Sequence, residues 1–523
     1  ARKIGCRFAQ ISQSGRISSP RPPRQRTQET RFEARPPRST VEQAVITAMA
    51  SVAKNTAYMT FASVGQKVLS FLYFTFIARM VGAEDTGKYF LALSFTTIFA
   101  VITDFGLSPS LNREVARKPE EAARHLSSVL GVKMLFMAAT YVIMMAVAIL
   151  LDYSSEMQLL IALSGITMIL DSIHLSFYAV LRGMHKLKYE ALAIVLSQLS
   201  TLIIGSIALL LGRPLVWLII AFIVSSFLNV CYAAYMLRYR AGVPLRVRWE
   251  SALIKSMLVV AFPFALAGIF ARVYSYSDSV FLSKFASTTA VGWYSIPNKI
   301  TFAFQFIPLA LSAALYPRMS EAFICDRPHL TYLFERAMKY LILVAMPIAV
   351  FLGVFSEEII LTIYTAEYAP AIIPMQILLA SVIFAFIDFP VGALLNGCNR
   401  QAMQTTAMGV AMVVNVVANI LLIPPYGVIG AAIAALLGNI VLFAAGYFFV
   451  PRIALVHHGR IIGWAVGAGL LAGVVGLLMW IGAVIMPWYL TLALGSVLYC
   501  GGLVVTRLVK IDEIRYLVHR VRA

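Results

Sequence analysis

The sequence is poor in charge, and poorest in acidic residues. Among 523 residues there are 24 Asp or Glu and 43 Lys or Arg, which gives a formal net charge of +19. Charged residues make up 13% of the chain and hydrophobic residues 60%. Such a chain cannot close into a soluble globule, because its polar side chains would not cover the surface. The shortage of charge therefore excludes a soluble enzyme and indicates a protein that spans a membrane many times.

Residue patterns that support chemistry are also missing. The five cysteines have no metal-site spacing, and the adjacent His457 and His458 have no partner His or Cys at zinc-site distance. No Gly-rich loop followed by Lys and Ser or Thr could cradle a nucleotide phosphate. No aromatic and basic module supports binding to nucleic acid. We therefore predict no catalytic residue, no metal, no cofactor, no enzymatic activity and no nucleic-acid partner.

Long apolar runs fill the chain from Tyr58 onward. A helix needs roughly 20 apolar residues to cross a bilayer, and a backbone in lipid must satisfy its own hydrogen bonds. We therefore predict an all-α polytopic membrane protein with about 14 transmembrane helices. They are expected near residues 58–81, 88–108, 126–151, 158–181, 189–211, 214–237, 255–285, 292–316, 333–355, 372–397, 402–423, 428–450, 461–483 and 487–508.

The segment before the first span has a different composition, rich in Arg, Pro, Ser and Gln. Such a segment buries too little apolar area to fold alone. A transit peptide has a similar composition, but the sequence from Met49 looks like a natural start, so we favour an extended reading frame. We expect a basic disordered tail at 1–54, six-helix bundles at 55–250 and 251–455, two additional helices at 456–510 and a cytoplasmic tail at 511–523.

Basic residues collect in alternate connections between the spans. These connections lie at 113–124, 182–188, 238–255 and 318–339, whereas most acidic residues outside the spans lie in the opposite connections. Lys and Arg are enriched on the cytoplasmic side of membrane proteins. We therefore expect a multi-pass protein of the cell inner membrane with both termini in the cytoplasm.

One stretch of the chain occurs twice. Lys67 to Tyr89, KVLSFLYFTFIARMVGAEDTGKY, aligns without a gap with Arg272 to Tyr294, RVYSYSDSVFLSKFASTTAVGWY, at a constant offset of 205. An internal duplication explains this match. Because six spans separate the copies, both enter the membrane from the same side. We therefore predict two parallel six-helix repeats around a central cavity, followed by two C-terminal helices.

Both copies keep a cation inside an apolar helix, Lys67 in the first and Arg272 in the second. A charge at the centre of the bilayer costs roughly 2.5 to 3.5 kcal/mol on insertion scales, so it usually faces a partner or a water-filled cavity. We favour a pair of cations that line a transport path, and the alternative is a pair of structural cations neutralised by nearby acids. Lys299 either snorkels to the outer interface or adds a third cation.

Three acidic residues, Asp171, Asp278 and Asp388, also fall inside predicted spans, with His174 one helical turn from Asp171. A desolvated carboxylate binds protons more readily, and a nearby cation reverses the effect. We therefore interpret Asp171, His174, Asp278 and Asp388 as candidates for coupling transport to a proton or sodium ion. The alternative is that the acids are structural counter-charges to Lys67, Arg272 and Lys133.

Three motifs resemble the polysaccharide flippase family of the multidrug/oligosaccharidyl-lipid/polysaccharide exporter superfamily. They are FIARMVGAEDTGKYFLAL, DFGLSPSLNREVAR and, as the most specific, NVVANILLIPPYGVIGAAIAALLGN. The resemblance extends from Tyr58 to Val509. It implies two six-helix bundles around a cavity that opens alternately to each side, with basic residues in the first helix of each half attracting a pyrophosphate-linked glycan.

The resemblance also implies a cargo and its partners. The family exports lipid-linked O-antigen or exopolysaccharide units, so we expect flipping of a polyprenyl-pyrophosphate oligosaccharide, driven by a cation gradient, with membrane lipid and a polysaccharide polymerase as further partners. One alternative is a multidrug/cation antiporter of the same superfamily, for which we would expect an acid-dominated cavity. Another is a membrane-embedded glycan polymerase, which would need a long outer loop or a cytoplasmic carboxylate pair.

Overall fold

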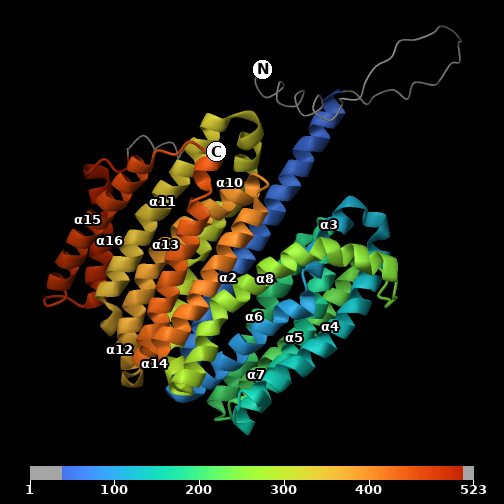
Figure 1. Cartoon of the computed structure of the whole chain (residues 1–523), viewed down its shortest axis with the longest axis horizontal. Helices are drawn as coiled ribbons and strands as arrows, with labels where there is room; N and C mark the ends of the chain where they lie inside the picture. Colours follow the sequence, from blue (N-terminus) through green and yellow to red (C-terminus); the bar gives the residue numbers. More distant parts are fainter. Residues whose placement is uncertain (1–37, 510–523) are drawn as a thin grey trace, which may run out of the picture.

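The computed structural model describes residues 38–509, and every regular element in that range is helical. Figure 1 shows α3 to α7 on one side and α10 to α16 on the other, with the first part of α2 between them. The helices are α2 (Arg38–Asp104), α3 (Leu107–Arg117), α4 (Ala122–Leu150), α5 (Ser155–Gly183), α6 (Leu187–Leu210), α7 (Val216–Tyr235), α8 (Ser251–Phe285), α9 (Thr288–Phe304), α10 (Phe306–Cys325), α11 (Arg327–Val354), α12 (Ser356–Ile363), α13 (Ile372–Gly397), α14 (Gln401–Tyr447), α15 (His458–Gly482) and α16 (Trp488–Val505). Short 3₁₀ or π turns lie at Pro119–Glu121, Met236–Arg240, Ala366–Ala371 and Val450–Arg452.

The described residues contain 12 helical segments that are long and apolar enough to cross a membrane. Two of them, Phe61–Asp104 with 44 residues and Gln401–Arg452 with 52, are too long for one crossing, since a bilayer core of about 30 Å needs about 20 helical residues. Each is bent at a glycine with positive φ, 78° at Gly82 and 54° at Gly427. Both segments are therefore two spans, and the prediction of 14 transmembrane helices is confirmed.

The first helix begins earlier than the sequence suggested. Residues 38–54, which we expected within a disordered tail, form the start of α2, so that part of the prediction is wrong. The segment around Glu42 and Gln43 is rich in Ala and has no Pro or Gly, and such residues favour a helix even where little apolar surface is buried. The remaining predicted tail residues, 1–37 and 511–523, lie outside the described residues.

The eighth span is broken where we expected one helix over 292–316. Helix α9 ends at Phe304 and α10 begins at Phe306. Pro308 has no backbone N–H, so the carbonyl of Phe304 cannot receive the usual hydrogen bond from four residues ahead. The break therefore follows from this proline, and it divides the span into two parts, α9 and α10.

The two halves meet through equivalent positions of the repeat. A Cβ atom on Gly87 would lie 1.9 Å from the carbonyl oxygen of Thr288, and one on Gly292 would lie 1.9 Å from that of Ala83. Thr288 and Gly292 each follow their counterparts, Ala83 and Gly87, by the repeat offset of 205. The two contacts are thus related by the duplication, and small residues allow the backbones to touch. Helices α15 and α16 lie outside this pair of bundles, next to α11 (Figure 1).

Candidate functional site

Two of the predicted cations lie across the contact between α2 and α9. The Nζ atom of Lys67 lies 5.7 Å from the ring centroid of Phe302, and that of Lys299 lies 5.2 Å from Phe74 and 5.6 Å from Phe90. Each half therefore contributes a cation that rests on an aromatic ring of the other half. An aromatic face attracts a cation by about 0.5 to 2 kcal/mol, depending on desolvation. Because the ring does not neutralise the cation, the cation can still attract an anion.

Arg272 is exposed on the face of α8 that is directed toward the first half. Gly268, four residues earlier and therefore on the same face, packs against Val101, because a Cβ on this glycine would lie 3.1 Å from Val101 Cγ1. The structure thus places Arg272 at the boundary between the halves. No hydrogen bond or ring contact joins it to Lys67 or Lys299 within the described residues.

None of these three cations forms an ion pair with an acid in the described part of the chain. Lys67 and Lys299 are half-buried and Arg272 is exposed. A cation in a membrane span normally pairs with an acid or faces water. Their lack of an acidic partner suits a surface that receives a negatively charged group.

Lys133 differs, because an acid neutralises it. Its fully buried Nζ lies 2.5 Å from Asp104 Oδ1 and also donates to Ser108 Oγ at 3.1 Å, Ser176 Oγ at 2.8 Å and the Ser172 carbonyl at 3.0 Å. The alternative in which one of the three predicted acids balances Lys133 is therefore wrong. Sequence reasoning missed Asp104 because it lies at the very end of its span, inside the DFG stretch used as a family motif.

Asp278 on α8 is the centre of a buried polar network. Its carboxylate accepts hydrogen bonds from Tyr294 Oη and from Asn419 Nδ2, both at 2.6 Å. Asn415 Oδ1 accepts from Asn419 Nδ2 at 3.1 Å and from Ser277 Oγ at 3.3 Å. Helices α8, α9 and α14 are thereby joined around one acid that has no cationic partner. Sequence reasoning did not predict the role of the two asparagines, although both lie in the most specific family motif.

A small polar cavity of about 90 Å³ lies beside this network. Two buried atoms of the network, Asn415 Nδ2 and Asn419 Oδ1, have no hydrogen-bond partner among the described residues, and Asn415 also lines the cavity. Buried polar atoms are nearly always satisfied, so such an exception points to a water molecule or an ion. Oxygen atoms for a small cation are available on Asp278 and on further residues that line the cavity, Tyr274, Ser275, Asn298, Ser381 and Asn439.

Within the described part of the chain, the remaining predicted residues form no hydrogen bond with this network. In the first half, Asp171 Oδ1 accepts hydrogen bonds from His174 Nε2 at 3.0 Å and from Ser226 Oγ on α7 at 2.7 Å, so these two candidates form one pair. In the second half, Asp388 on α13 has a buried Oδ1 without a hydrogen-bond partner. On α14, a Cβ added at Gly446 would lie 3.5 Å from that oxygen.

Comparison with known families places the chain among proteins of polysaccharide biosynthesis. The family model described as polysaccharide biosynthesis protein matches residues 52–323, more than half of the chain. A second family model, MatE, matches residues 263–421. The chain is 24% identical over 434 residues to a probable low-salt glycan biosynthesis flippase, Agl15, of Haloferax volcanii, covering 78% of this chain and 85% of that protein. It is 21% identical over 328 residues to a putative O-antigen transporter of Shigella flexneri, covering 61% and 77%.

Solved structures share the fold at low sequence identity. The lipid II flippase MurJ in its inward closed conformation superposes with a TM-score of 0.72 at 16% identity, covering 85% of this chain and 97% of that one. An inward-facing multidrug resistance transporter of the MATE family superposes with a TM-score of 0.62 at 15% identity, covering 78% and 98%. The multi-pass fold and the family match agree: the chain belongs to the polysaccharide biosynthesis protein family, and its fold is that of MurJ and of the MATE transporters.

Proposed function

We propose that the protein translocates a polyprenyl-pyrophosphate-linked oligosaccharide across the cytoplasmic membrane for cell-surface polysaccharide synthesis. The observation that carries the proposal is the position of Lys67 and Lys299, one from each half, at the contact between the bundles without an acidic partner. Arg272 lies on the face of α8 toward the same boundary. A site that both halves build is the kind that alternating access can offer first to one side and then to the other.

Electrostatics favours a pyrophosphate as the group that these cations bind. Two unit charges 4 Å apart attract by about 1 kcal/mol in water and by about 4 kcal/mol at the effective dielectric near a protein surface. Several cations add their attraction to one multivalent anion. A neutral glycan would gain nothing from this arrangement, and a cationic drug would be repelled by it.

A cation gradient is the proposed driving force, and Asp278 is the principal candidate for the coupling residue. Its network borders the small polar cavity and contains, beside the carboxylate, one buried acceptor without a partner, Asn419 Oδ1, which supports binding of a proton or a sodium ion. The Asp171–His174 pair and Asp388 are further candidates, because each holds an ionisable group within the spans. We also propose that both termini face the cytoplasm. A polysaccharide polymerase on the outer side would receive the flipped unit.

The experiment is complementation of a bacterial strain that lacks its own O-antigen flippase. Lys67→Ala and Lys299→Ala should each reduce surface polysaccharide strongly at unchanged protein level, while Lys188→Ala, which removes an exposed charge at the start of α6, should not. Full export by the Lys67→Ala, Lys299→Ala double variant contradicts the proposal.

A second candidate function is export of organic cations in exchange for an ion, because the MatE family model matches residues 263–421. The two functions predict opposite effects on activity when the cavity cations are neutralised. An antiporter for cationic drugs should accept its substrates better when Lys67 or Arg272 is neutralised, whereas the flippase should lose activity. Drug resistance of cells that express each variant, measured beside surface polysaccharide, separates the two.

A further inference from the structure

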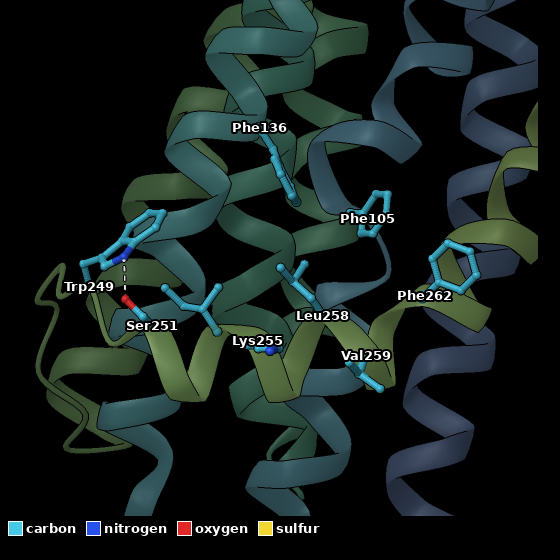
Figure 2. A pocket seen from close by; sticks show the side chains of 9 residues that line it. Phe105, Phe136, Trp249, Ser251, Lys255, Leu258, Val259 and Phe262 are labelled. Atoms are coloured by element: carbon cyan, nitrogen blue, oxygen red, sulfur yellow. Dashed lines mark hydrogen bonds between the residues drawn. The ribbon is translucent and has the colours of Figure 1, made fainter.

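A second cavity, larger and almost entirely apolar, opens between the two halves. It has a volume of about 660 Å³ and lies between α4 of the first half and the beginning of α8 of the second. Figure 2 shows Trp249 and Ser251 at one end, Phe262 at the other, and the rings of Phe105 and Phe136 above α8. We call this cavity the lateral groove.

Hydrogen bonds tie the walls of the lateral groove to each other. Arg124 on α4 donates through Nε to Glu250 Oε2 at 2.9 Å and through Nη2 to Glu250 Oε1, and this bonding lowers the pKa of the Glu250 carboxyl. The backbone N–H of Arg248 donates to the Ser127 carbonyl at 3.2 Å. The start of α8 is thus fixed against α4, and the groove between them is a formed feature of this conformation.

The α8 wall of the groove carries a cation between Ser251 and Val259 (Figure 2). Lys255 lines the groove, is exposed, and forms no ion pair with a described residue. Trp249, at one end of the groove, donates its indole N–H to Ser251 Oγ at 3.2 Å, and Trp and Lys are typical of the membrane interface. Apolar walls with a cation among them complement a lipid with one long chain and a phosphate.

The groove also leads along α8 toward the cation site. Arg272 follows Phe262 by ten residues on the same helix, which corresponds to about 15 Å along its axis. The proposed cargo must bring its pyrophosphate from the cytoplasmic leaflet to this depth. An ordinary phospholipid is not the proposed cargo, so its phosphate need not reach this depth.

We propose that the lateral groove binds the first isoprene units of the carrier lipid, with Lys255 contacting its phosphate before the phosphate reaches Arg272. This inference rests on the proposed function, because it places the lipid part of the same cargo. It assigns the groove a role in loading from the cytoplasmic leaflet. The aromatic side chains supply affinity for the chain, and Lys255 supplies selectivity for an anionic head.

The test measures binding of radiolabelled decaprenyl monophosphate, which carries no glycan, to the purified full-length protein in phosphatidylcholine nanodiscs. Phe262→Ala should weaken binding about tenfold, or by about 1.4 kcal/mol, since part of the apolar area that the isoprene chain would bury is lost. Phe227→Ala is the matched control, because Phe227 on α7 is 55% exposed and Phe262 is 56% exposed. Lys255→Gln should weaken binding of the monophosphate and leave binding of uncharged decaprenol unchanged, while Lys188→Gln should affect neither.

Equal affinity of the Phe262→Ala and Phe227→Ala variants overturns the proposal. So does displacement of the probe by phosphatidylglycerol at the same concentration as by unlabelled decaprenyl phosphate, which would make the groove a general site for anionic lipid. The assay involves no transport. A failure here therefore leaves the proposed flippase function standing, and a failed complementation experiment leaves the binding result standing.

Discussion

Tyr73 occupies in the first half the repeat position that Asp278 holds in the second, 205 residues later. Both side chains are buried, with 3% and 4% of their surface exposed. The Tyr73 hydroxyl has no hydrogen-bond partner and packs against Gly205, where a Cβ would lie 1.8 Å from it, whereas Asp278 accepts two strong hydrogen bonds. At this repeat position only the second half carries an acid with a hydrogen-bond network, which is why we propose Asp278 as the principal coupling residue.

Replacing this acid should uncouple transport. In Asp278→Asn the carboxylate charge is lost, while an amide oxygen remains to accept the bond from Tyr294, so the protein should fold and lose its dependence on the ion gradient. Tyr73→Phe, at the equivalent position, removes a hydroxyl without a partner and should change nothing. The measurement is glycan export with the proton or the sodium gradient collapsed separately. Wild-type gradient dependence in Asp278→Asn would exclude this residue as the coupling site.

The contact between the halves should tolerate no side chain at Gly87. In Gly87→Ala the new methyl group would lie 1.9 Å from the Thr288 carbonyl oxygen, so α2 and α9 must separate, and overpacking of this kind costs roughly 1 to 3 kcal/mol. Gly473→Ala is the control, because no atom lies within 4 Å of a Cβ there. Thermal unfolding in detergent, followed by fluorescence-detected size exclusion, should show a lower transition for Gly87→Ala alone. Equal transitions would contradict the contact.

The buried pair of Lys133 and Asp104 should be needed for stability. Lys133→Met leaves the half-buried Asp104 carboxylate without its cation, a change that costs roughly 3 to 5 kcal/mol in fully buried pairs and should cost less here. The Lys133→Met, Asp104→Leu double variant removes both charges and should be more stable than the single variant. Lys118→Met, which breaks an exposed pair with Glu121, should leave the unfolding temperature unchanged. A double variant less stable than Lys133→Met would argue that the pair does more than balance charge.

Patterns that depend on length and periodicity were predictable from sequence alone. The spans follow from apolar runs, and the duplicated Lys67–Tyr89 stretch predicts two halves that the contact between Gly87 and Gly292 joins. That Lys67 is a cation within a membrane span was also predictable, since a charged residue in an apolar helix is rare.

Partnerships between helices were not predictable in the same way. Asp104 lies 29 residues from Lys133 and Asn419 lies 141 residues from Asp278, so neither pair follows from spacing on one helix. The cation–aromatic contacts of Lys67 and Lys299 depend on how α2 packs on α9. The helical start at Arg38 was missed because composition alone suggested disorder for the whole segment.

The most direct measurement of the central claim is flipping of a fluorescently labelled lipid-linked oligosaccharide in liposomes that contain the purified protein, read as the fraction of label that membrane-impermeant dithionite reduces. Removing the cations weakens the attraction for the pyrophosphate. We predict that Lys67→Ala and Arg272→Ala each slow flipping at least tenfold, that Lys67→Arg, which keeps the charge with altered geometry, is milder, and that Lys188→Ala matches the unsubstituted protein. Flipping at the unsubstituted rate by a correctly folded Lys67→Ala, Arg272→Ala double variant would contradict the claim that these cations bind the cargo.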